Sequence, residues 1–209
     1  MNKPYNIYLI RHGETLWNKN QRFQGMIDTE LSENGIRQAQ KLARRLIGRK
    51  FAAIYSSDLK RAFATAQEIA TGSGMEITAE PRFREMSFGE WEGLDYSGLG
   101  KKWQGKMNGF FRDPMSVAIP GGESFDDFCN RVCSAFYEVV ARHEGQDVLI
   151  VSHGGSIRAI IADILKFPAA SFWSVRLENT AVSIIQVADG RFLLSKLNDT
   201  THLEESPLL

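Results

Sequence analysis

Short apolar runs alternate along the chain with longer segments in which apolar residues recur at helical spacing. Three runs rich in strand formers end abruptly in polar or glycine-bearing turns, as buried strands do: residues 5–10, 52–55 and 147–152. Two later runs predict strands joined by a turn at Asp189-Gly190: residues 181–187 and 192–197.

Apolar stripes predict helices between these strands, over residues 36–47, 59–70, 125–140 and 157–165. Serine precedes three of them as a candidate N-cap: Ser32, Ser57 and Ser124. Because strands and helices alternate, the pattern predicts an α/β fold. We expect a three-layer sandwich with a mainly parallel central sheet flanked by helices.

The segment from about residue 82 to 122 interrupts this alternation. It is rich in Gly, Trp, Phe and Lys and ends at Pro120-Gly121-Gly122. No linker, repeat or low-complexity tract sets it apart as a second domain. We therefore interpret residues 1–209 as one domain with a small insertion that lies over the sheet edge and roofs the site.

Composition narrows the choice of partners and location. The 25 basic residues balance the 25 acidic ones, which argues against nucleic acid or a membrane surface as a partner. No apolar run reaches membrane-span length, and Met1–Pro4 lacks a signal-peptide pattern, so we expect a cytoplasmic protein, monomer or homodimer. Cys129 and Cys133 share a helix face without further zinc ligands, and we expect reduced thiols.

The candidate chemistry follows the ends of the predicted strands. Arg11-His12-Gly13, the Ser57–Arg61 turn and His153-Gly154-Gly155 each come directly after a strand. In open α/β sheets, ligands bind beyond the carboxyl ends of the strands. Free backbone N–H groups at helix starts favour an anion there, and a guanidinium matches phosphate oxygens in a bidentate way. This convergence predicts a phosphate site containing two of the chain's four histidines.

Four sequence blocks carry a resemblance to a known family. Leu9-Ile10-Arg11-His12-Gly13-Glu14-Thr15, followed by Trp17-Asn18, resembles the signature of the histidine phosphatase superfamily, which includes the cofactor-dependent phosphoglycerate mutases. Three further blocks are similar to the family's later motifs: Ser57-x-x-x-Arg61-Ala62-x-x-Thr65-Ala66, Arg84-Glu85-x-x-Phe88-Gly89-x-Trp91-Glu92-Gly93 and Val151-Ser152-His153-Gly154-Gly155. The resemblance runs from Tyr5 to about Leu203 and implies a phosphoglycerate mutase-like fold.

The resemblance implies a role for each matching residue. His12 would attack phosphorus and form a phosphohistidine, and Glu85 would protonate the leaving alcohol and later activate water. The phosphoryl oxygens would be held by Arg11, Asn18, Arg61, His153 and Gly154, with a weaker match at Gln24 and Gly25. Enough fixed positive charge would remove the need for a metal ion, and no cofactor is implied.

The resemblance leaves the outcome of the reaction open. A short insertion and the tail 198–203 favour a phosphatase for a small phosphate ester. With residues 120–124, that tail resembles α-ribazole-5′-phosphate phosphatases of cobalamin biosynthesis, and also broad-specificity bacterial phosphatases. The alternatives are a cofactor-dependent phosphoglycerate mutase and a non-catalytic module that binds a phosphorylated ligand. A mutase could use basic residues of the insertion for a second anionic group, although we favour a solvated basic face for them: Lys101, Lys102, Lys106 and Arg112.

Other residues of interest have two interpretations each. The insertion's aromatic residues either line a pocket for a large leaving group or pack the insertion onto the sheet: Trp91, Tyr96, Trp103, Phe110 and Phe111. For His143 we favour a structural place at a helix C-terminus. His202 lies in the returning tail, and there too we favour a structural role.

Overall fold

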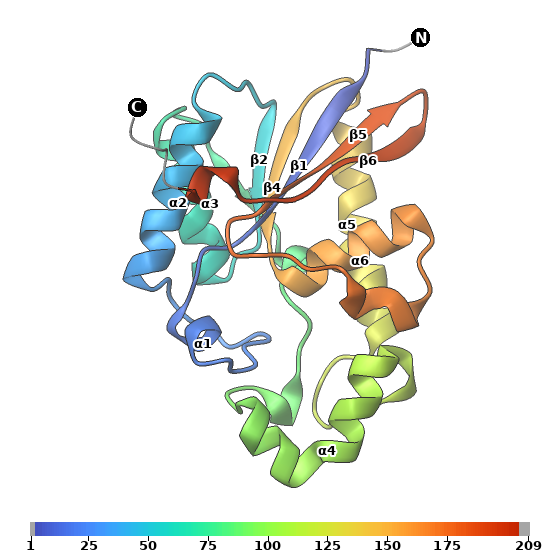
Figure 1. Ribbon diagram of the computed structural model, residues 1–209. Helices are drawn as coiled ribbons and strands as arrows, with labels where there is room; N and C mark the ends of the chain where they lie inside the picture. The colour runs from blue at the N-terminus through green and yellow to red at the C-terminus, as the bar shows by residue number, and fades with distance from the viewer. Residues whose placement is uncertain (1–2, 205–209) are drawn as a thin grey trace.

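The computed structural model describes residues 3–204, which form a six-stranded sheet between two layers of helices (Figure 1). The strands are β1 (Tyr5–Arg11), β2 (Ala53–Ser56), β3 (Ile77–Ala79), β4 (Val148–Ser152), β5 (Val182–Ala188) and β6 (Arg191–Asp199). Their order across the sheet is β3-β2-β4-β1-β5-β6. The first four in this order are parallel, whereas β5 runs antiparallel to both neighbours. The predicted sandwich is confirmed.

Both faces of the sheet are covered. Helices α2 (Glu33–Leu46) and α3 (Lys60–Thr71) lie on one face, and α5 (Phe125–Arg142) and α6 (Gly154–Leu165) lie on the other (Figure 1). Successive residues of the buried strands therefore face opposite layers: Ile10 packs with the α2–α3 side and Leu9 with the α5–α6 side. This two-sided burial explains why the central strands read as continuous apolar runs.

The remaining helical elements are short, except for one 17-residue helix in the inserted segment. They are α1 (Leu16–Lys19), α4 (Tyr96–Arg112) and the 3₁₀ turns η1 (Pro81–Phe83), η2 (Gly89–Trp91), η3 (Pro114–Ser116), η4 (Ala169–Ser174) and η5 (Thr201–Leu203). We did not predict strand β3 because it has only three residues, two of them exposed, and these show no hydrophobic pattern.

Two of the three predicted N-caps are present. The hydroxyls of Ser32 and Ser124 accept from backbone N–H groups three residues ahead. The third prediction was wrong: α3 begins after Leu59, and Ser57 lies two residues before that cap. The N–H of Lys60 instead donates to the Asp28 carboxylate, 2.7 Å away. The Ser57 hydroxyl accepts from the Leu59 N–H at 3.3 Å and lies 2.8 Å from His153 Nε2.

The inserted segment lies beyond the carboxyl ends of the strands, drawn in green at the bottom of Figure 1. Its centre is α4, which is kinked at Trp103. Trp91 and Phe110 are fully buried in the core, which supports the packing interpretation for these two. Tyr96 and Phe111 reach a large pocket instead.

Cys129 and Cys133 are free, half-buried thiols, and burial raises the pKa of each to about 12. His143 is the C-cap of α5, as expected, with its Nε2 2.9 Å from the Tyr55 hydroxyl. Within residues 3–204, no helix is long and apolar enough to cross a membrane.

Candidate active site

The carboxyl ends of β1, β2 and β4 meet at one point. The His12 N–H donates to the Ser152 carbonyl and the Ser57 N–H to the Val151 carbonyl, both at 2.9 Å. The parallel ladder thus continues one residue past each strand. It brings the imidazoles of His12 and His153 to a centroid separation of 5.1 Å. The predicted convergence of the two histidines is present.

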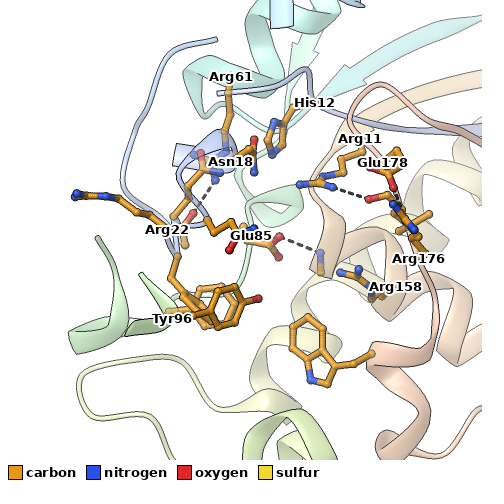
Figure 2. A pocket seen from close by; sticks show the side chains of 18 of the residues that line it. Arg11, His12, Asn18, Arg22, Arg61, Glu85, Tyr96, Arg158, Arg176 and Glu178 are labelled. Carbon is orange, nitrogen blue, oxygen red and sulfur yellow. Dashed lines mark hydrogen bonds and ion pairs between the residues drawn. The ribbon is translucent and has the colours of Figure 1, made fainter. Parts of the chain in front are cut away.

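A pocket of about 570 Å³ opens at this point (Figure 2). Seven of the nine predicted site residues line it: Arg11, His12, Asn18, Gln24, Gly25, Arg61 and Glu85. His153 lies against His12 and is fully buried, and Gly154 begins α6 beside it. The structure therefore brings all nine residues together, while their roles stay predictions.

The backbone fixes the tautomer of His12. Its Nδ1 lies 2.7 Å from the Gly13 carbonyl oxygen, which can only accept, so Nδ1 carries the proton and Nε2 keeps its lone pair. Burial, reinforced by Arg61 and Arg11, holds the pKa of His12 well below 6.5. The ring is therefore a neutral imidazole at physiological pH.

Only glycine, which has no side chain, fits at position 13 in this arrangement. A Cβ there would lie 2.6 Å from the Gly35 carbonyl oxygen of α2. Its N–H also donates to the Thr65 hydroxyl of α3 at 3.0 Å. The carbonyl that orients His12 is thereby held between two helices.

The segment after η4 stabilises the backbone at Arg11 and His12. The Asn179 amide donates to the His12 carbonyl at 2.9 Å, and the Thr180 N–H donates to the Arg11 carbonyl at 3.0 Å. Thr180 takes a positive φ of 57°, which is costly for a β-branched residue. His202 lies 3.0 Å from the Thr180 hydroxyl and does not line the pocket. The tail therefore returns to the site as a support.

Three buried nitrogen atoms at the site have no hydrogen-bond partner: Arg11 Nε, Arg61 Nε and His153 Nδ1. Arg11 Nη1 donates to the Leu177 carbonyl, and the two terminal nitrogens of Arg61 donate to the carbonyls of Ile27 and Gly25. Unpaired buried polar atoms are rare because each costs free energy. Together with two buried positive charges, they indicate a site built for an anion.

Hydrogen bonds to their oxygen atoms fix the orientation of the side-chain amides of Asn18 and Gln24. Asn18 Oδ1 accepts from the Thr15 N–H at 3.1 Å, and Gln24 Oε1 accepts from the Thr29 hydroxyl at 2.7 Å. Because both oxygen ends are occupied, the NH₂ ends are available to a ligand in the pocket. The sequence alone gave no indication of these anchoring threonines.

Glu85 is bound to the start of α6. Its Oε2 accepts from the Gly155 N–H at 2.9 Å, and its Oε1 accepts from the Met86 N–H at 3.0 Å. A Cβ on Gly155 would lie 2.2 Å from Glu85 Oε1, so glycine is required for this approach. Figure 2 shows Glu85 across the hollow from His12.

Further arginines and aromatic rings complete the lining of the pocket. None of the insertion's four candidate basic residues lines the pocket. Lys102 pairs with Glu90 at 3.0 Å and lies with Lys106 over the Trp103 ring, so the pocket gives no support to a second anion site at these residues, and the solvated basic face that we favoured fits them better. Besides Arg11 and Arg61, the arginines that line the pocket are Arg22, Arg158 and Arg176, with the rings of Phe23, Phe88, Tyr96, Phe111 and Trp173.

One sequence signal could have identified Arg158. It is the only charged residue between His153 and Asp163, in an otherwise apolar helix that starts at a strand end.

Within the described part of the chain, no three His, Cys, Asp or Glu side chains cluster as metal ligands.

The comparison with protein families decides the identity. The model of the histidine phosphatase superfamily (branch 1) matches residues 7–200. This chain belongs to the histidine phosphatase superfamily. The four sequence blocks that resembled the family's motifs, and the fold described above, are therefore those of a superfamily member.

Three relatives of this superfamily member are each 37% identical to it. They are phosphoserine phosphatase 1 of Hydrogenobacter thermophilus (95% of this chain and 94% of the relative), metal-independent phosphoserine phosphatase of Arabidopsis thaliana (94% and 82%) and phosphoglycerate mutase-like protein 4 of the same plant (97% and 89%). A solved structure of a putative α-ribazole-5′-P phosphatase from Escherichia coli aligns with a TM-score of 0.85 at 29% identity, covering 94% of this chain and 97% of that one. The predicted metal-independent phosphatase of the histidine phosphatase superfamily is confirmed.

Proposed function

We propose that this chain, as one histidine phosphatase domain, hydrolyses a small-molecule phosphate monoester through a phosphohistidine on His12. One observation carries the proposal: a neutral imidazole presents its free Nε2 to a pocket edged by buried, unpartnered guanidinium nitrogens. A neutral nucleophile and fixed donors for the phosphoryl oxygens are two parts that phosphoryl transfer requires.

In the first step, His12 Nε2 forms a bond to phosphorus as the bond to the ester oxygen breaks. Glu85, in its protonated form, gives its proton to the departing alcohol. The equatorial oxygens gain charge in the transition state, and the donors of Arg11, Arg61 and Asn18 then bind them more strongly. His153 Nδ1 supplies a further donor when the Ser57 hydroxyl donates to its Nε2.

In the second step, the Glu85 carboxylate takes a proton from a water molecule that attacks phosphorus. The P–N bond breaks, inorganic phosphate leaves, and Nε2 of His12 recovers its lone pair. Glu85 is again protonated, so the cycle closes without any group other than the chain's own residues.

Hydrolysis of p-nitrophenyl phosphate in EDTA tests the proposal. We expect release of p-nitrophenol to stay within about twofold of the rate without chelator, because fixed guanidinium charge stabilises the transferring group. The measurement is the initial rate with and without EDTA. Complete loss on chelation, restored by added Mg²⁺ or Zn²⁺, would contradict the mechanism.

Glu85→Gln separates acid catalysis from other roles of this carboxylate. We expect alkyl phosphates to slow by about 10²–10³-fold but p-nitrophenyl phosphate by much less, because p-nitrophenolate leaves without a proton. Steady-state kcat/KM for both ester types is the measurement. Glu90→Gln is the matched control, since that carboxylate is exposed and pairs with Lys102. Equal slowing of both esters would argue against Glu85 as the acid.

The identity of the physiological ester requires a separate test, and a panel of phosphomonoesters provides it. Two relatives are named for phosphoserine, and the Escherichia coli structure is named for α-ribazole-5′-P. Our preference for α-ribazole 5′-phosphate, and with it cobalamin biosynthesis and a cytoplasmic location, stays a prediction. The aromatic rings of the pocket support a leaving group larger than glycerate.

A phosphoglycerate mutase is the second candidate, supported by the mutase-like relative. The panel therefore includes 3-phosphoglycerate with and without 2,3-bisphosphoglycerate. Rapid interconversion of phosphoglycerates with little phosphate release would favour the mutase. Phosphate binding without turnover of any ester would favour the non-catalytic module instead.

A further inference from the structure

Glu85 lies in a segment that regular secondary structure does not support. Residues 84–88 follow η1 and form neither helix nor strand. Four successive carbonyl oxygens of this segment instead accept from side chains of β4, α5 and α6: those of Arg82 and Glu85 from Arg131, that of Phe83 from Ser152, and that of Arg84 from Arg131 and Ser156. Because backbone polar groups need partners, these side-chain donors determine where the Glu85 backbone lies.

Arg131 of α5 makes most of these bonds. Its Nη1 donates to the carbonyls of Arg82 at 2.8 Å and Arg84 at 3.0 Å, and its Nη2 donates to that of Glu85 at 3.3 Å. Its Nε and Nη2 bind the two carboxylate oxygens of Glu123, both at 2.8 Å. A guanidinium carries five N–H donors, and each of those on Arg131 has an acceptor. Arg131 does not line the pocket, so it acts on the chain itself and not on a substrate.

Glu123 reaches Arg131 from the turn over residues 120–124. Its N–H donates to the Ser87 carbonyl at 3.0 Å, and a Cβ on Gly122 would lie 2.8 Å from the same oxygen, so glycine is required for this close approach. The Arg131 and Glu123 side chains are 20% and 17% exposed. A bidentate pair that is this shielded from water has a fixed geometry. The turn therefore supplies the carboxylate that orients Arg131 toward the Glu85 segment.

We propose that Arg131, oriented by Glu123, is a positioning residue for acid–base catalysis and holds the Glu85 backbone where the carboxyl group meets the ester oxygen. This inference rests on the proposed function, in which Glu85 protonates the leaving alcohol. The Gly155 N–H fixes the carboxyl group, and Arg131 fixes the backbone that carries it. Proton transfer requires hydrogen-bond reach, and a misplacement of about 1 Å can cost about 10²-fold in rate.

A different role for Arg131 would act on a different part of the reaction. Burial, reinforced most by Arg61, holds the pKa of His153 well below 6.5, and the charge of Arg131 adds a smaller contribution. An effect through His153 would change the binding of the phosphoryl group, which every ester shares. An effect through Glu85 would depend on whether the leaving group needs a proton. The two routes are therefore distinguishable by the choice of ester.

The test compares benzyl phosphate, whose alkoxide needs a proton to leave, with p-nitrophenyl phosphate, whose phenolate does not. Arg131→Met should lower the benzyl-to-p-nitrophenyl ratio of kcat/KM by about 10- to 30-fold. Arg131→Lys should lower it by about fivefold, because an ammonium has three donors for five acceptors, and Glu123→Gln by about threefold. Arg82→Met is the matched control and should stay within about twofold, since that side chain pairs with Glu80 and Glu138.

Folding defects do not imitate this result. Both esters are measured on one preparation, so an inactive fraction of the protein lowers the two kcat/KM values equally and leaves their ratio unchanged. A thermal melt of each variant identifies loss of folding. If Arg131→Met protein does not fold, the milder Arg131→Lys variant carries the comparison.

The double variant Arg131→Met/Glu85→Gln identifies the route. Its ratio should equal that of Glu85→Gln within about twofold, because Arg131 has no proton donor left to position. Equal slowing of both esters by Arg131→Met, or falls in the ratio that multiply in the double variant, would overturn the proposal. An unchanged ratio in Glu85→Gln itself would reject the acid role in the proposed function. A fall in Glu85→Gln without one in either Arg131 variant would reject only the positioning role.

Discussion

His12→Ala is expected to lower kcat by about four to six orders of magnitude and to abolish phosphoryl labelling of the protein. The chain has no second imidazole that can replace His12, because His153 is buried beneath it and engages Ser57 through Nε2. Rapid quench with a ³²P-labelled ester, followed by acid and base treatment, measures the intermediate. Label that is stable in base and lost in acid marks a phosphohistidine.

His143→Ala is the matched control for this experiment. His143 caps α5, contacts Tyr55 and does not line the pocket, so turnover and label should stay at the wild-type level. A circular dichroism spectrum and a thermal melt of both variants would exclude unfolding as the cause. Undiminished label on His12→Ala protein would reject this residue as the nucleophile.

The electrostatics of His12 add a pH signature. Attack requires the neutral imidazole, and burial, Arg61 and Arg11 lower its pKa well below 6.5. As the pH falls, protonation therefore removes the nucleophile only well below that value. The amplitude of the p-nitrophenol burst should consequently stay constant between about pH 7.5 and 6.5. A burst that titrates with a midpoint near 6.5 would indicate an exposed, unperturbed histidine.

The sequence predicted the parts of the site that follow from strand ends. Two-sided burial makes β1 and β4 continuous apolar runs, and parallel strands must bring their carboxyl ends to one edge. His12 and His153 come one residue past those ends, so their meeting was predictable. Glu85 was different: it lies in an irregular segment, and only the motif resemblance identified it.

The parts that could not be predicted depend on contacts between distant segments. The partners that orient Gln24 and His12, such as Thr29 and Asn179, lie in loops whose approach leaves no periodic pattern. The basic residues of α4 left two interpretations open because a charge run has the same appearance whether it faces solvent or a ligand. Arg158 was overlooked because the apolar stripe of α6 was read as core alone.

Arg61→Met is expected to lower kcat/KM by about 10³-fold, the second largest effect among these variants. Arg61 is fully buried, its two terminal nitrogens are engaged by the carbonyls of Ile27 and Gly25, and its Nε has no partner. That anchoring holds Nε in place before substrate arrives, so no reorganisation is needed as charge develops. Lysine cannot hold both carbonyls and a ligand, and Arg61→Lys should lose about 10²-fold.

Anion binding shows whether this loss arises in the transition state. Orthovanadate takes up the five-coordinate geometry of phosphoryl transfer, whereas inorganic phosphate does not, so wild-type protein should bind vanadate more tightly. Arg61→Met should weaken vanadate binding far more than phosphate binding, measured by the rise in melting temperature at graded anion concentrations. Arg112→Met, at the end of α4 and outside the pocket, is the charge-matched control. If both anions weaken equally, Arg61 contributes general attraction, and the preorganised donor set must be located elsewhere in the pocket.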